Sequence, residues 1–190
     1  MAMKTRRWAI AGGTAVAFFG YAVGSADGPP ALEAWPAVEA VYAPRQGSPP
    51  DRAIVELIDG AGERVDVAAF ALTHGEIVDA LVRAARRGVR VRVLTDERQA
   101  RQGAQKGALM RLAAAGIPIR TNVHPGAMHL KLLAVDRAEA GFGSYNLTVA
   151  ATERNEELWI TVRGPAAARL ADVFETIWSD GRRYRPWEGR

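Results

Sequence analysis

Cysteine is absent from this 190-residue chain, and histidine occurs only three times. Without cysteine the protein has no disulfide bond, no zinc–thiolate site and no thiol nucleophile, so its chemistry must come from histidine, carboxylates, lysine and hydroxyl groups. Internal repeats and low-complexity tracts are also missing. What the chain does contain is 48% hydrophobic and 24% charged residues, which is the composition of a globular domain rather than of a disordered chain.

The N-terminal segment has the pattern of an export signal. Residues 1–7 are short and basic, residues 8–24 carry no charge, and residues 24–26 are small, as a signal peptidase requires. A twin-arginine route is a further option, because Arg6 and Arg7 are adjacent. The uncharged stretch is at the lower limit of length for a membrane span, so an uncleaved anchor is the alternative. We expect residues 1–26 to be a signal peptide or membrane anchor, and the protein to be exported to the periplasm or medium or held at a membrane.

The net charge of +4 depends on this leader, which holds three basic residues and no acidic ones. Without it, 22 basic residues face 21 acidic ones, a net charge of +1. A local excess remains between Arg83 and Arg120, where ten basic residues accompany only Asp96 and Glu97. This segment is either a phosphate-binding surface or a set of solvated helix faces.

The rest of the chain predicts one domain. Residues 27–36 are rich in proline and glycine and indicate a linker, residues 37–180 have the size of a single domain, and residues 181–190 are expected to form a loosely held basic tail.

Within that domain, strand-like and helix-like patterns alternate, which indicates an α/β layered fold with largely parallel pairing in its first half. In residues 89–94 valine alternates with arginine, so we expect one face of that strand to be in solvent. The expected strands are 38–43, 65–70, 89–94, 117–121 and 158–162, with a hairpin of 128–135 and 140–144 joined by 136–139; the expected helices are 51–60 (capped by Asp51), 74–87 (ended by Gly88), 99–115 (ended by Gly116) and one from Pro165.

Polar side chains gather at the strand ends of the second half. Alternate side chains of a strand share a face, so His129 and Lys131 point the same way with Cα atoms about 7 Å apart. A nucleophile and a cation can therefore share one pocket. Other candidates in this region are Ser144, Asn146 and Glu157.

Two carboxylates in this region have different expected roles. Asp136 lies seven residues from His129 and points to the opposite face of a regular strand, so we expect it to be structural. Glu157 is free to hold one nitrogen of an imidazole, which fixes the tautomer and makes the other nitrogen a better nucleophile. His74 and His124 lack the spacing of metal ligands relative to His129, so no metal is expected.

These residues form the pattern His129-x-Lys131-x4-Asp136-x6-Gly143-Ser144-x-Asn146, which resembles the signature of the phospholipase D superfamily at every specified position. The similarity is greatest to the small single-motif branch, which includes a bacterial secreted endonuclease and mitochondrial outer-membrane phospholipase-D-like proteins. Leu130 departs from many members, which have a second polar or aromatic residue there. The resemblance implies a phospholipase D-like layered fold, with a mixed β-sheet flanked by α-helices.

The resemblance also implies hydrolysis of phosphodiesters in two steps, without a metal or other cofactor. His129 would attack phosphorus to form a phosphohistidine, a second histidine would protonate the leaving oxygen, and water would release the product. Because the chain has one motif, a homodimer would supply the second His129. Lys131 and Asn146 would bind phosphate oxygens, Ser144 would position the phosphate or a neighbouring side chain, and Glu157 would orient the histidine.

The motif does not distinguish between substrates. A non-specific endonuclease is the first hypothesis, because the chain is short and has an arginine-rich segment. The alternative is a phospholipase D that converts phosphatidyl lipids to phosphatidic acid, with membrane association through residues 8–24. A third possibility, from a different class, is a non-catalytic scaffold that binds a polyanion or a membrane.

Overall fold

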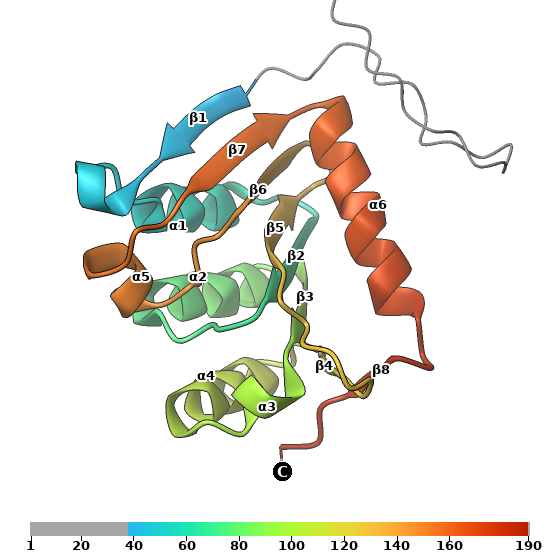
Figure 1. Ribbon diagram of the computed structural model, residues 1–190. Helices are drawn as coiled ribbons and strands as arrows, with labels where there is room; N and C mark the ends of the chain where they lie inside the picture. Colours follow the sequence, from blue (N-terminus) through green and yellow to red (C-terminus); the bar gives the residue numbers. More distant parts are fainter. Residues whose placement is uncertain (1–37, 190) are drawn as a thin grey trace, which may run out of the picture. The chain divides into compact units, whose positions relative to one another are not determined.

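The computed structural model describes residues 38–189, so the predicted leader (1–26) and linker (27–36) lie outside the described residues. The described residues form a mixed eight-stranded sheet with helices on both faces, in the strand order β1-β7-β6-β5-β2-β3-β4-β8 (Figure 1). The α/β class expected from the sequence is confirmed.

The predicted elements occur close to their expected positions. The strands are β1 (Val38–Tyr42), β2 (Arg64–Ala69), β3 (Arg90–Thr95), β4 (Ile119–Asn122), β5 (Lys131–Val135), β6 (Glu139–Gly143), β7 (Trp159–Arg163) and β8 (Tyr184–Pro186). The helices are α1 (Asp51–Gly60), α2 (Gly75–Arg86), α3 (Glu97–Ala100), α4 (Gly103–Ala114), α5 (Val149–Glu153) and α6 (Pro165–Ser179), with a 3-10 turn at Pro44–Gln46. Among residues 38–189, no helix is both long enough and apolar enough to cross a membrane.

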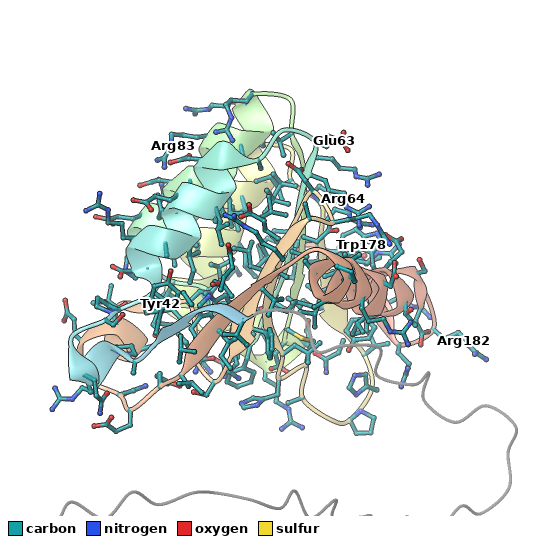
Figure 2. The ribbon with its side chains drawn as sticks, turned by 90° about the horizontal axis from the view of Figure 1, so that it is seen from above. Tyr42, Glu63, Arg64, Arg83, Trp178 and Arg182 are labelled. Carbon is teal, nitrogen blue, oxygen red and sulfur yellow. The ribbon has the colours of Figure 1, made fainter. Side chains whose placement is uncertain are left out.

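The central strands β2, β3 and β4 are parallel, as predicted, and the strands on either side of them are antiparallel. Helices α1, α2 and α4 lie on one face of the sheet and α6 lies on the other (Figures 1 and 2). Successive side chains of β2 point to opposite faces of the sheet and so pack in different cores. Val65 and Val67 belong to the core on one face, and Ala68 packs with Phe174 of α6 in the core on the other face. Gly88 and Gly116 end α2 and α4 with positive φ angles of 88° and 77°.

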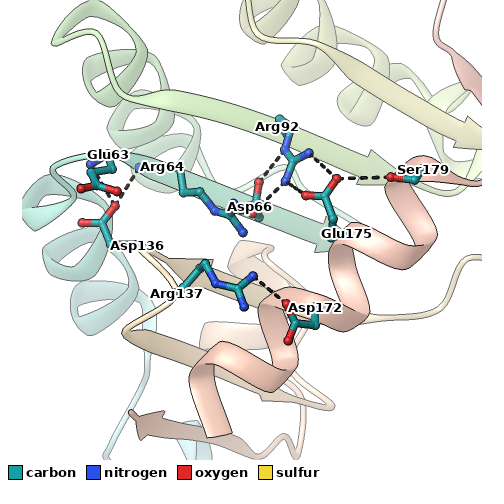
Figure 3. Close-up of polar contacts among 9 residues, drawn as sticks. All are labelled: Glu63, Arg64, Asp66, Arg92, Asp136, Arg137, Asp172, Glu175 and Ser179. Carbon is teal, nitrogen blue, oxygen red and sulfur yellow. Dashed lines mark hydrogen bonds and ion pairs between the residues drawn. The ribbon is translucent and has the colours of Figure 1, made fainter. Parts of the chain in front are cut away.

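The solvent-facing side predicted for residues 89–94 holds at Arg90, which is exposed, but is wrong at Arg92, because α6 covers that part of the face. Arg92 is only 7% exposed; its Nε donates to Asp66 Oδ1 at 2.8 Å and its Nη2 to Glu175 Oε2 at 2.7 Å (Figure 3). Burial opposes the charge of Arg92, but the bonds to Asp66 and Glu175 outweigh it and raise the pKa of Arg92 above its ordinary value. The valine–arginine alternation thus marks a buried ion pair beneath α6.

Three smaller expectations also differ from the structure. The predicted helix 99–115 is divided at residues 101–102, between α3, which the Asp96 carboxylate begins by accepting bonds from Arg98 N and Gln99 N, and α4, which begins at Gly103. Pro50 rather than Asp51 occupies the N-cap position of α1. The tail is not loosely held over its whole length, because residues 184–186 pair with β4 and Tyr184 is buried.

Candidate active site

One edge of the sheet carries all five predicted polar residues. Because β5 is antiparallel to β2, Lys131 pairs with Ala69 at the carboxyl end of β2, and His129 lies just before β5. Ser144 and Asn146 follow the end of β6, and Glu157 precedes β7 at the same edge. The topology therefore brings together residues that are up to 28 positions apart in the sequence.

His129 and Lys131 lie side by side, as expected, although His129 itself is outside the strand, so its direction is not set by strand alternation. Lys131 Nζ is 3.2 Å from His129 Nε2 and donates to the His129 carbonyl oxygen at 2.9 Å. Donation by the ammonium to Nε2 requires that nitrogen to be unprotonated, so the proton of a neutral ring is on Nδ1. The arrangement leaves the lone pair of an exposed imidazole next to a cation.

Phe70 forms the wall behind this pair. Its ring centroid is 4.5 Å from that of His129, and Lys131 Nζ lies 5.0 Å from the Phe70 centroid. Burial lowers the pKa of Lys131, and the charge of Glu157 opposes this shift. An ammonium group that has lost part of its water interacts more strongly with an incoming anion.

Ser144 and Glu157 form a second pair. Ser144 Oγ donates to Glu157 Oε2 at 2.6 Å and accepts from Leu158 N at 3.0 Å, while Asn155 Nδ2 donates to Glu157 Oε1 at 3.2 Å. Both carboxylate oxygens are thus occupied, and within residues 38–189 no hydrogen bond joins Glu157 to His129. The orienting role of Glu157 stays a prediction.

The side chain of Asn146 has a buried polar atom that is not hydrogen-bonded within residues 38–189. That atom is Oδ1. Rotation of the amide by half a turn exchanges oxygen and nitrogen, so the same position can present an acceptor or the NH2 donor that a phosphate oxygen requires.

Asp136 and Gly143 both make contacts that position the backbone around the site. The Asp136 carboxylate accepts from the backbone nitrogens of Gly62, Glu63 and Arg64 at 2.8, 2.9 and 2.7 Å, and Figure 3 shows Asp136 with Glu63 and Arg64. Asp136 lies in the turn after β5, whereas His129 lies before β5, at the other end of the hairpin. A Cβ atom on Gly143 would lie 2.0 Å from the Leu158 carbonyl oxygen, so only glycine allows β6 to approach the residue that bonds Ser144.

Replacement of Asp136 by asparagine is expected to destabilise the fold by about 1–3 kcal/mol at pH 7, because an ionised acceptor of three N–H groups becomes neutral. Burial alone would raise the pKa of Asp136, but the backbone hydrogen bonds and Arg64 outweigh it and hold the pKa below its ordinary value. The Asp136 carboxylate therefore stabilises the fold at pH values above the pKa of about 4 that this group has in the unfolded chain. That stabilisation is lost as the pH falls through the lower pKa that the group has in the folded protein.

Urea unfolding of both proteins at pH 7 and at pH 3 measures this effect. The difference in free energy of unfolding between wild type and Asp136→Asn should be smaller at pH 3 than at pH 7. A difference of the same size at both pH values contradicts the assignment of Asp136 as an ionised acceptor. Asp172→Asn is the matched control, because Asp172 is exposed and its partner is the exposed Arg137, 2.6 Å away; its effect should be smaller.

A buried polar network that the sequence did not reveal fixes the loop behind the site. Gln105 Nε2 donates to Thr95 Oγ1 at 2.9 Å, and Gln105 Oε1 accepts from Leu72 N at 2.7 Å. The loop in turn donates from His74 N to the carbonyl oxygen of Leu147, the neighbour of Asn146. Thr95 and Gln105 occupy ordinary strand and helix positions, so the only sequence signal for the network was a polar residue on the buried face of α4.

The arginine-rich segment does not form one basic surface. Arg83 and Arg87 pair with Asp59 of α1, Arg92 is buried beneath α6, Arg101 pairs with Glu97, Arg111 pairs with Asp79, and Arg120 lies 4.9 Å from the Trp178 ring centroid. Within residues 38–189, Arg86, Arg90, Arg98 and Lys106 have no carboxylate partner.

The other two histidines have separate surroundings. His74 is buried and its Nε2 is 3.8 Å from Asp51 Oδ2, whereas His124 Nε2 is 3.4 Å from the Tyr184 hydroxyl. In the described part of the chain, no group of three or more His, Cys, Asp or Glu side chains is arranged to hold a metal ion.

Comparison with known proteins agrees with this geometry. Residues 54–178 match the family described as cardiolipin synthase, PLD-like domain. The chain is 33% identical over 125 residues to phospholipase D of Rickettsia prowazekii, and the match covers 66% of this chain and 58% of that protein. It is 36% identical over 116 residues to human mitochondrial cardiolipin hydrolase, covering 60% and 45% of the two chains. The chain thus matches about half of the length of these relatives.

A solved structure gives the same result over a greater length. The crystal structure of Nuc from Salmonella typhimurium, a phospholipase D family member, is similar with a TM-score of 0.72 and 31% sequence identity, and the match covers 81% of this chain and 99% of Nuc. The family match includes every motif residue from His129 to Asn146, together with Glu157. The chain therefore belongs to the phospholipase D-like family.

Proposed function

We propose that this protein is a phosphodiesterase that hydrolyses nucleic acid without base specificity, through a phosphohistidine formed on His129. The observation that carries the proposal is the position of the exposed His129 Nε2, 3.2 Å from the ammonium of Lys131. A nucleophile next to a partly desolvated cation suits attack on a phosphorus atom with negatively charged oxygens.

The first step forms a bond between His129 Nε2 and phosphorus and breaks the bond from phosphorus to the leaving oxygen. That oxygen takes a proton from a second imidazole. In the second step water attacks phosphorus, gives its proton back to that imidazole, and releases the phosphate monoester with His129 restored. Lys131 and Asn146 stabilise the negative oxygens, and Ser144 holds Glu157 close to the reacting groups.

The second imidazole comes from a homodimer in this proposal. His129 and Ser144 are exposed at the site edge, and so are two large apolar residues, Leu130 at 38% and Leu158 at 43%. Leu130 adjoins His129 in the sequence, and the Leu158 backbone bonds to Ser144. Exposed apolar side chains beside one half of a catalytic pair are what a two-fold interface would cover.

The same leucines support a second candidate, a phospholipase D that acts on phosphatidyl lipids, because apolar side chains beside the nucleophile can contact acyl chains. In either case we propose that residues 1–26 export the domain or anchor it at a membrane.

Purified protein, incubated in excess EDTA with plasmid DNA, single-stranded oligonucleotide and labelled vesicles of phosphatidylcholine or cardiolipin, tests these assignments. We expect cleavage of nucleic acid, unaffected by EDTA, because His129 and Lys131 supply the nucleophile and the charge. A loss in EDTA that added divalent metal restores would overturn the metal-free scheme. Release of lipid head groups without DNA cleavage would favour the second candidate, and a folded dimer with no turnover would favour a binding scaffold.

A further inference from the structure

A groove lies at the same edge of the sheet as His129. Its volume is about 600 Å³, within the range of ligand pockets, and it lies between α3, the loop after β4 and the C-terminal β8 segment. The side chains that matter are Arg98, Asn122, His124, Arg185 and Trp187.

The groove is connected to the catalytic loop by hydrogen bonds. Asn122 Oδ1 accepts from Glu97 N at 2.9 Å, and Asn122 Nδ2 donates to the Gly126 carbonyl oxygen at 2.7 Å. Gly126 lines the groove and lies three residues before His129. One residue before His129, Met128 N donates to the carboxylate of Asp96 at 3.0 Å. One short segment, residues 126–129, therefore forms part of the groove wall and carries the nucleophile His129.

The charge in the groove is available for a ligand. Glu97 is occupied by Arg101, whose Nη2 is 2.7 Å away, and Glu188 also lines the groove. Among residues 38–189, Arg98 and Arg185 are exposed and have no carboxylate partner, unlike most arginines of the fold. They come from different elements, since Arg98 is in α3 and Arg185 is in β8.

Aromatic rings accompany these two cations. Trp187 is partly exposed, and the His124 ring, also partly exposed, lies 5.6 Å from that of Tyr184 in an edge-on contact. Separated cations with interleaved aromatic rings suit a flexible strand of nucleotides, whose phosphates need cations and whose unpaired bases stack on rings.

We propose that this groove binds the part of a single-stranded nucleic acid that flanks the scissile phosphate. Arg98 and Arg185 contact backbone phosphates, and Trp187 and His124 contact bases. The inference rests on the proposed nuclease function and adds a substrate subsite, made of α3, the 122–126 loop and β8, that lies outside the catalytic motif.

Binding is tested with a fluorescein-labelled 12-nucleotide single strand and protein in the His129→Asn background, so that the strand is not consumed. Adding Arg98→Ala and Arg185→Ala should weaken binding about tenfold or more at low salt, and should lower the slope of log K against log salt by about 1.4, since each phosphate contact contributes about 0.7. Arg86→Ala with Arg90→Ala is the matched control. Both arginines are exposed and lack carboxylate partners among the described residues, but Arg90 begins β3, about 17 Å from the site edge.

Kinetics in the His129-intact protein separate this inference from the proposed function. The ratio of kcat/KM for the oligonucleotide to kcat/KM for bis(p-nitrophenyl) phosphate, which is too small to span both sites, should fall about tenfold in the Arg98→Ala, Arg185→Ala protein. An unchanged ratio and salt slope, or equal losses in the control, would refute the subsite while leaving the nuclease assignment in place. If wild type cleaves neither substrate, the proposed function fails, and the binding measurement still decides whether the groove holds a single strand.

Discussion

The replacement of His129 by asparagine is expected to lower phosphodiester turnover by about 10³-fold or more, because the amide cannot form the covalent intermediate. The fold should persist, since the His129 side chain is exposed and, among residues 38–189, its ring has one aromatic partner, Phe70, and one polar partner, Lys131. Turnover of bis(p-nitrophenyl) phosphate and thermal unfolding measure the two effects. If a correctly folded variant keeps even a tenth of wild-type activity, His129 is not the nucleophile.

Mixed dimers separate a shared site from two independent ones. When wild type and His129→Asn are co-expressed in equal amounts and assort at random, about one quarter of dimers contain two copies of His129 and half contain one. A site that needs both imidazoles should therefore give about one quarter of wild-type activity per protomer. About one half would show that each protomer works alone.

Alternation along the chain predicted much of this site because the local pattern and the fold agree there. Period two predicted that His129 lies with Lys131 and that Asp136 points away from them; the structure shows the contact and the separation, although His129 and Asp136 both lie just outside β5, at its opposite ends. Alternation of strands and helices likewise predicted the parallel core of β2, β3 and β4. Those expectations depended on residues close together in the sequence, whose separation along the chain already limits where they can lie.

The features that the sequence did not predict depend instead on contacts between segments that are far apart in the sequence. Arg92 was expected in solvent, but Glu175, 83 residues later, brings α6 over it. Arg98 was one of ten similar basic residues, and only the fold separates it from those paired with carboxylates. Gln105 contacts Leu72 from 33 residues away, which no periodicity indicates. Sequence patterns thus located the motif, whereas its supporting residues required the tertiary structure.

The edge of the site gives a last test, which concerns assembly. Introducing glutamate at both Leu130 and Leu158 places two carboxylates in the proposed two-fold interface, where each would be repeated by the partner. Burying four unpaired charges should dissociate the dimer and lower turnover by about 100-fold or more, because each monomer retains one imidazole. Both side chains are already partly in solvent, so the monomer should remain folded. Light scattering after gel filtration and turnover at the same concentrations measure the two effects.

Met110→Glu combined with Val173→Glu is the matched control, because these residues are also exposed and apolar but lie on α4 and α6, away from the site edge. That variant should remain dimeric and active. The decisive comparison is between assembly and turnover in the Leu130→Glu, Leu158→Glu protein. If it becomes monomeric yet works at the wild-type rate, one imidazole suffices and the leaving oxygen must take its proton from a residue of the same chain. If turnover instead follows the dimer fraction as protein concentration is raised, the site is completed by the partner.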